Sequence, residues 1–107
     1  MLPNTTPFYA IITLMQTTLE SLKNWKADNA GRYGIVEMGV FGSFARGETT
    51  PESDVDVVIT MKEPDLFAMI GIQMELEQYL NKPVDVVSSG TKNAFLKKRI
   101  ERDKVVV

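Results

Sequence analysis

The chain has 107 residues, of which 44% are hydrophobic and 24% are charged, and its formal net charge is −2. This length is enough for one small domain with a single core, and the composition is that of an ordinary globular protein. The slightly acidic balance gives no overall field that would attract nucleic acid. Because the sequence contains no Cys and no His, it excludes disulfides, thiol chemistry, imidazole bases and the usual zinc ligands. Any bound metal must therefore be held by oxygen atoms.

The N-terminal part carries no recognisable targeting signal. Its first apolar run, from Phe8 to Met15, lacks a basic flank and a small-residue cleavage site. That run is also far shorter than the roughly 20 residues that span a bilayer. We therefore expect a soluble cytoplasmic protein without membrane contact, and the absence of Cys agrees with a reducing compartment.

The first third of the chain predicts one long amphipathic helix. Residues 1–6 show no periodicity, and we expect them to be frayed. Thr6 as the N-cap and Pro7 at the first helical position would begin the helix. Apolar residues then recur at helical spacing as far as Trp25, and we expect the helix to end near Gly31.

Two strands separated by a polar loop are expected next. Residues 35–41 are mostly apolar and run directly into a Gly-Ser pair. Residues 48–53 are polar and contain Pro51, which suits a turn. Residues 54–60 are rich in Val and Ile, so they predict a strand that is buried on both faces.

A second helix, a third strand and a short last strand complete the expected order. Residues 63–65 would open the helix, which would end at Leu80, before Lys82-Pro83. Residues 84–88 read as a strand, and residues 105–107 as an edge strand. We expect the inner face of the helix to carry Leu66, Met69 or Ile70, Gln73, Leu76 and Leu80.

The segment from 92 to 101 predicts a short basic helix with Phe95, Leu96 and Ile100 facing inward. Its basic residues, with those that follow, are either a solvated helix face or a contact surface for a partner or RNA. They are Lys92, Lys97, Lys98, Arg99, Arg102 and Lys104.

Three carboxylates provide the candidate metal ligands. Asp54 and Asp56 are two residues apart on a strand, so their side chains should share one face. Two carboxylates this close disfavour joint ionisation unless a cation lies between them, and Mg²⁺ prefers such ligands. If the third strand lies beside the second, Asp85 joins them at one end of the sheet. A phosphoryl-transfer site with up to two metal ions would then be possible.

The Gly42-Ser43 pair provides the candidate phosphate-binding turn. Glycine allows backbone N–H groups to approach phosphate oxygens, and the Ser hydroxyl adds a donor. A helical turn beginning near Ser43 would add partial positive charge. Arg46 could neutralise phosphate or anchor the loop. Taken singly, a Gly-Ser pair is usually a simple turn, and carboxylates at a strand end are usually solvated. Their concentration at consecutive strand ends favours a catalytic site.

These motifs resemble the signature of the minimal nucleotidyltransferase (MNT) family, within the DNA polymerase β-like superfamily. The matching stretches are Gly42–Gly47, Ser53–Val58 and Lys82–Val87, without departure at the key positions. The resemblance extends over nearly the whole chain and implies one domain over residues 1–107. The implied fold is an α/β (α+β) palm-like fold, with a small mixed sheet of three to four strands and helices packed on one side.

The resemblance also implies roles for individual residues. Asp54 and Asp56 would hold Mg²⁺, and Asp85 would complete the metal site and help to orient or deprotonate the attacking hydroxyl. ATP would be the substrate, although no base-reading residue is identified. The nucleotide-binding set would be Gly42, Ser43, Arg46 and Ser53.

Family members are typically paired with a HEPN-domain ribonuclease as toxin and antitoxin. The resemblance therefore implies a protein adenylyltransferase that moves AMP onto a toxin tyrosine. One alternative is a non-catalytic antitoxin that occludes its partner. Another is a nucleotidyltransferase that modifies a small molecule, as aminoglycoside-modifying relatives do, with a homodimer forming the acceptor pocket.

Overall fold

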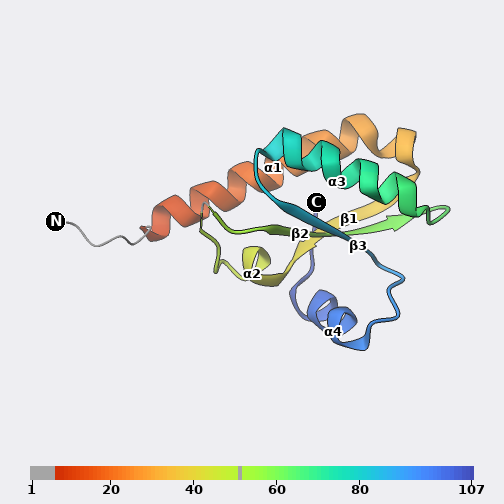
Figure 1. Ribbon diagram of the computed structural model, residues 1–107. Helices are drawn as coiled ribbons and strands as arrows, with labels where there is room; N and C mark the ends of the chain where they lie inside the picture. The colour runs from red at the N-terminus through yellow and green to blue at the C-terminus, as the bar shows by residue number, and fades with distance from the viewer. Residues whose placement is uncertain (1–6, 51) are drawn as a thin grey trace.

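The computed structural model describes residues 7–50 and 52–107. The expected fraying of residues 1–6, the predicted N-cap Thr6 and Pro51 of the predicted loop lie outside this range. The elements, in chain order, are α1 (Phe8–Tyr33), β1 (Ile35–Phe41), α2 (Gly42–Ala45), β2 (Val55–Met61), α3 (Leu66–Leu80), β3 (Val84–Ser88), α4 (Ala94–Asp103) and β4 (Val105–Val106). The predicted α+β fold class is confirmed (Figure 1).

The sheet has four strands in the order β3-β2-β1-β4. Strand β1 runs antiparallel to β2 and to β4, whereas β2 and β3 are parallel. The parallel pair is joined by α3, the kind of crossover that parallel strands require. The predicted edge strand near the C-terminus is confirmed, because Val105 and Val106 pair with Val40 and Gly39.

One face of the sheet is covered by the two long helices, α1 and α3 (Figure 1). Alternate residues of each strand point to this face, as the two-residue period of a strand requires. Leu22 and Trp25 of α1 and Ile72 and Leu76 of α3 pack against them. The strand residues of this main core are Ile35, Met38, Val40, Val55, Val57, Ile59, Val84 and Val86.

The opposite face is covered by α4, so the expectation of helices on one side holds for α1 and α3 only. Ile100 and Leu96 of α4 pack against Phe41 and Val58 in a smaller second cluster. Phe95 was predicted to face inward but is 75% exposed. Leu96 and Ile100 are four residues apart and therefore lie on the same face of the helix, which packs on the sheet. Phe95 is rotated by about 100° from Leu96 and points away from that face.

Helix α1 differs from its predicted limits at both ends. Pro7 occupies the cap position and Phe8 is the first helical residue. The helix continues past Gly31 to Tyr33, because one glycine inside a helix is tolerated at a modest cost. It ends at Gly34, whose φ of 69° is the left-handed conformation that favours glycine as a C-cap.

Helix α3 begins as predicted, at a cap provided by Asp65. The Asp65 carboxylate accepts hydrogen bonds from the backbone N–H groups of Phe67 and Ala68. The predicted inner face is wrong at Leu66, which is 70% exposed. Of the two alternatives Met69 and Ile70, Met69 is the one that packs inward, and Ile70 is 50% exposed. The helix is apolar on several sides, so its periodicity alone did not define its rotation. The residues that pack into the main core are Met69, Ile72, Leu76 and Leu80.

No helix within the described ranges is long and apolar enough to cross a membrane.

Candidate active site

The parallel pairing of β2 and β3 brings two of the predicted carboxylates side by side. Asp56 is directly opposite Asp85 in the register, and on its other side it is opposite Phe41 of β1. Since Val55 and Val57 point into the main core, Asp56 projects from the face that α4 covers. Asp85 lies between core residues in the same way. Asp54 is exposed and immediately precedes β2.

Asp56 is the least exposed of these carboxylates, with 19% of its side chain accessible. Burial raises the pKa of the Asp56 carboxyl above its ordinary value, and the positive charge of Arg99 offsets part of the rise. The negative charges of Asp85 and Asp54 raise the pKa further, while Arg46 lowers it slightly. Asp54 and Asp85 are therefore close enough to Asp56 to interact with it electrostatically.

Arg99 of α4 is a site residue that the sequence analysis did not identify. Its Nη2 atom lies 3.6 Å from Oδ2 of Asp56, and its guanidinium is 5.7 Å from the centre of the Phe41 ring. The sequence analysis grouped Arg99 with the basic segment. Arg99 immediately precedes Ile100, which was predicted to face inward, and this was the one sign that Arg99 lies near the sheet. The sequence did not indicate which face of the sheet α4 would cover.

The Gly42-Ser43 pair begins the short helix α2 directly after β1, as predicted. Gly42 has a φ of 73°, and a Cβ atom at this position would lie 2.3 Å from Oδ2 of Asp56. A side chain is therefore excluded twice, by the backbone conformation and by the neighbouring carboxylate. Ser43 is partly exposed beside it. The predicted phosphate-binding turn and the central carboxylate are in direct contact.

Arg46 anchors the α2 turn to α4. It pairs with Asp103 at 2.7 Å and with Glu48 at 3.1 Å. The side chain of Asp103 is only 3% exposed and also binds Arg102. The hydrogen bond from Arg102 is the main cause that lowers the pKa of Asp103 to about 2, and Arg46 contributes. Of the two roles expected for Arg46, the structure favours that of an anchor.

Ser53 stabilises the loop that leads to the carboxylates. Its hydroxyl oxygen accepts a hydrogen bond from the backbone N–H of Thr50 at 2.9 Å, and it lies 3.0 Å from the Thr50 hydroxyl. These bonds close the loop immediately before Asp54. In this structure Ser53 is a loop residue, and its nucleotide contact stays a prediction.

Asp54, Asp56 and Asp85 do not form a complete set of metal ligands in this structure. Within residues 7–50 and 52–107, no group of three or more His, Cys, Asp and Glu residues is close enough together to hold a metal ion. The donors nevertheless fit a hard cation in kind, because Asp56 and Asp85 are adjacent carboxylates on one face of the sheet. In this structure the nearest positive charge to Asp56 is the Arg99 guanidinium.

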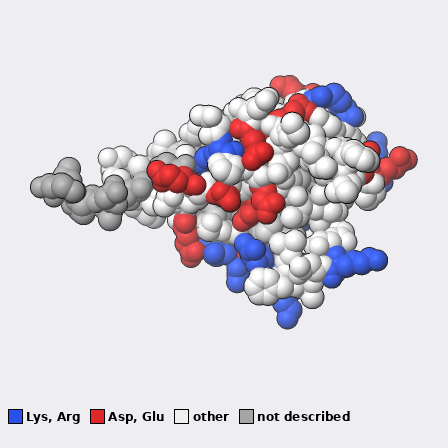
Figure 2. Space-filling model, in the orientation of Figure 1, with Lys and Arg blue, Asp and Glu red and all other residues white. Residues whose placement is uncertain are grey.

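Figure 2 shows acidic side chains gathered at the centre of one face of the molecule, with basic side chains immediately below them over α2 and α4. A site with adjacent carboxylates and cations can hold a polyphosphate together with its counter-ion.

Comparison with known proteins agrees with this arrangement. Residues 20–107 match the nucleotidyltransferase domain family. The chain is 35% identical over 95 residues to the protein adenylyltransferase MntA of Thermococcus cleftensis, covering 84% of this chain and 96% of that protein.

Two solved structures share the fold. One is a minimal nucleotidyltransferase that is 28% identical, with a TM-score of 0.67 over 91% of this chain and 95% of the other. The second is a complex of a tri-AMPylated Shewanella oneidensis HEPN toxin with its MNT antitoxin, which matches with a TM-score of 0.66 at 17% identity. That match covers 86% of this chain and 70% of the other. The motif, the fold and the relatives agree, and the chain belongs to the minimal nucleotidyltransferase family.

Proposed function

We propose that this protein transfers AMP from ATP to a tyrosine hydroxyl of a HEPN-type toxin and thereby acts as its antitoxin in the cytoplasm. The observation that carries the proposal is the contact between the Gly42 turn and Asp56, with Asp85 paired beside it. One small surface thus combines a phosphate-binding turn with adjacent carboxylates. The activity of the MntA relative and the AMPylated toxin in the Shewanella complex support the choice of reaction and partner.

The reaction requires a hydroxyl oxygen to attack the α-phosphorus of ATP. The bond between the α-phosphorus and the bridging oxygen breaks, and pyrophosphate leaves with the electron pair of that bond. The hydroxyl proton must pass to a base or to solvent. Since the chain has no His, a carboxylate is the available base, and the exposed Asp85 is our candidate.

Mg²⁺ is the cation that we assign to Asp54, Asp56 and Asp85. When bound, it would neutralise phosphate charge and stabilise the transition state. Gly42 and Ser43 would bind the β- and γ-phosphates through the backbone and the hydroxyl, and Arg46 would fix this turn against α4.

The direct test is incubation of the purified protein with labelled ATP, Mg²⁺ and the product of the neighbouring gene. We expect label on the partner from the wild-type protein and none from the Asp54→Ala or Asp56→Ala variants. The matched control is Asp28→Ala, which removes an exposed carboxylate of α1 away from the site.

Labelling that persists in the Asp54 and Asp56 variants would contradict the proposed chemistry. Turnover of a small hydroxylated acceptor without any partner would favour a small-molecule nucleotidyltransferase instead.

A second candidate function is neutralisation of the partner by binding alone. It is favoured by large apolar side chains at the exposed start of α1, where Phe8 is 76% and Tyr9 is 74% exposed. Such residues are typical of a contact surface. Full protection of cells by an Asp54/Asp56 double variant would establish this function in place of catalysis.

A further inference from the structure

A basic cavity of about 460 Å³ lies between α4 and the α2 turn. Apart from Phe95, each residue that lines it carries a positive charge, although the whole chain has a net charge of −2. Such a local excess of cations beside acidic residues favours a polyanionic ligand. The lining residues are Arg46, Phe95, Lys98, Arg99 and Arg102.

Arg99 is the cavity residue nearest to the candidate active site. Its Nη2 atom is 3.6 Å from Oδ2 of Asp56 and 3.2 Å from the point that a Cβ atom at Gly42 would occupy. The guanidinium therefore reaches both the central carboxylate and the phosphate-binding turn. Its position over the Phe41 ring adds a cation–π contact that helps to hold it there.

The other two arginines of the cavity are already engaged in the fold. Arg46 and Arg102 both bind the buried Asp103, at 2.7 and 2.8 Å. The ion pair of Arg99 with Asp56 is longer, at 3.6 Å, which exceeds ordinary hydrogen-bond length. Among the three arginines, Arg99 is therefore the one whose donors a ligand can take with the least loss of existing bonds.

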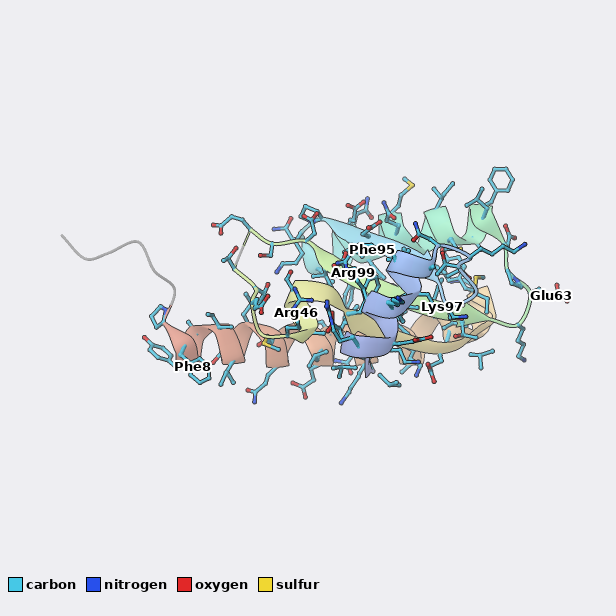
Figure 3. All side chains as sticks on the ribbon, turned by 90° about the horizontal axis from the view of Figure 1, so that it is seen from below. Phe8, Arg46, Glu63, Phe95, Lys97 and Arg99 are labelled. Atoms are coloured by element: carbon cyan, nitrogen blue, oxygen red, sulfur yellow. The ribbon has the colours of Figure 1, made fainter. Side chains whose placement is uncertain are left out.

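These contacts distinguish the two sides of α4. Figure 3 shows Phe95, Arg99 and Arg46 on one side of the helix, whereas Lys97 points away on the other. The cation that faces the site is an arginine, whose planar fork binds two phosphate oxygens at once.

We propose that Arg99 binds the β- and γ-phosphate oxygens of the nucleotide and stabilises the departing pyrophosphate. This inference rests on the proposed AMP transfer, and it adds a residue from α4 to the Gly42 turn and the carboxylates. As the bond to the α-phosphorus breaks, the leaving bridging oxygen gains negative charge, which the guanidinium beside the Gly42 turn would stabilise.

The test compares the affinities of the full chain for ATP and for AMP in Mg²⁺ buffer without a partner, measured by calorimetry. In Arg99→Ala we expect ATP binding to weaken about ten- to a hundredfold, the usual effect of losing a charged hydrogen bond, and AMP binding to change by less than about twofold. Lys97→Ala, the matched control on the other side of α4, should bind both as the wild type does.

Arg99→Lys is measured beside them, with circular dichroism to confirm folding, because it keeps a cation near Asp56 but loses the planar fork. We expect a smaller loss of ATP affinity than in Arg99→Ala and no change for AMP.

Equal affinity of Arg99→Ala and Lys97→Ala for ATP would overturn the inference while leaving the proposed AMP transfer intact. Equal losses for ATP and AMP would also overturn it, since the β- and γ-phosphates would not be the groups recognised. ATP affinity that is unchanged while association with the toxin weakens would mean that α4 is a protein-docking surface. Failure of the wild-type protein to bind ATP would overturn the proposed function itself.

Discussion

The sheet has two faces that are packed very differently. The face under α1 and α3 holds a continuous core that includes Leu22, Ile72 and Leu76, all fully buried. The face under α4 holds the smaller cluster of Phe41, Val58 and Ile100, and the Arg99–Asp56 ion pair lies beside it. We therefore expect stability to depend mainly on the first face, and we assign the chemistry to the second. Substitutions on the two faces should have separable effects.

The largest effect on stability is expected from the main core. Leu76→Ala should lower the free energy of unfolding by about 2–5 kcal/mol, because it leaves a cavity beneath α3. Urea unfolding measures this loss, and the specific transfer activity of the folded fraction should be unchanged. Met74→Ala, at an exposed position of the same helix, should stay within about 0.5 kcal/mol of the wild type. Equal losses in the two variants would contradict the assigned core.

After the complete loss expected for the Asp54 and Asp56 variants, the next largest effect on activity is expected at Gly42. Gly42→Ala places a methyl group against the Asp56 carboxylate, and a displacement on the order of 1 Å in an active site can reduce the rate about a hundredfold. The measurement is AMP transfer per folded molecule. Gly47→Ala is the control, because φ is also positive there but the nearest contact is the Met15 sulfur at 3.7 Å. Gly47→Ala should strain the backbone but keep the transfer activity. If it inactivates the protein as much as Gly42→Ala does, backbone strain alone would explain the loss in both variants.

A smaller effect on stability is expected at the cap of α3. Asp65→Ala removes the acceptor of two backbone N–H groups and should cost about 1 kcal/mol. Thermal unfolding measures it, and Asp65→Ser should restore most of the loss because serine also caps helices. A fall in the transfer activity of folded Asp65→Ala would show that the two faces are not independent.

A further effect is a pH dependence of stability on the α4 side. The pKa of Asp103 is about 2 in the folded protein, below the ordinary 3.8, because Arg102 and Arg46 bind it. Its stabilising contribution is thus fully present above pH of about 4 and is lost as the pH falls through about 2. Asp103→Asn should flatten the fall in unfolding temperature over that interval. An unchanged acid profile would mean that other carboxylates cause it.

The sequence predicted the strands and the side-by-side position of Asp56 and Asp85 well, whereas Asp54 lies just before β2 and not on it. The Val- and Ile-rich runs before Gly42 and after Asp54 could form little other than buried strands. The spacing of Asp56 and Asp85 from those runs then placed them together once β2 and β3 paired.

The helix faces were harder to predict, because rotation is fixed by tertiary packing. In α4, Phe95 and Leu96 are neighbouring apolar residues, and only the position of the sheet decides which one is buried. For the same reason Arg99 could not be distinguished from the other basic residues. Asp103 likewise gave no sign in the sequence that it would be buried between two arginines.

We assign AMP transfer to a partner protein to the face under α4. The decisive measurement is the mass of the toxin after coexpression with the wild-type protein or with the Asp54/Asp56 double alanine variant, with peptide mapping of the modified residue. We expect AMP on a toxin tyrosine with the wild-type protein and an unmodified toxin with the variant. An unmodified toxin that is nevertheless neutralised by the wild-type protein would contradict this assignment.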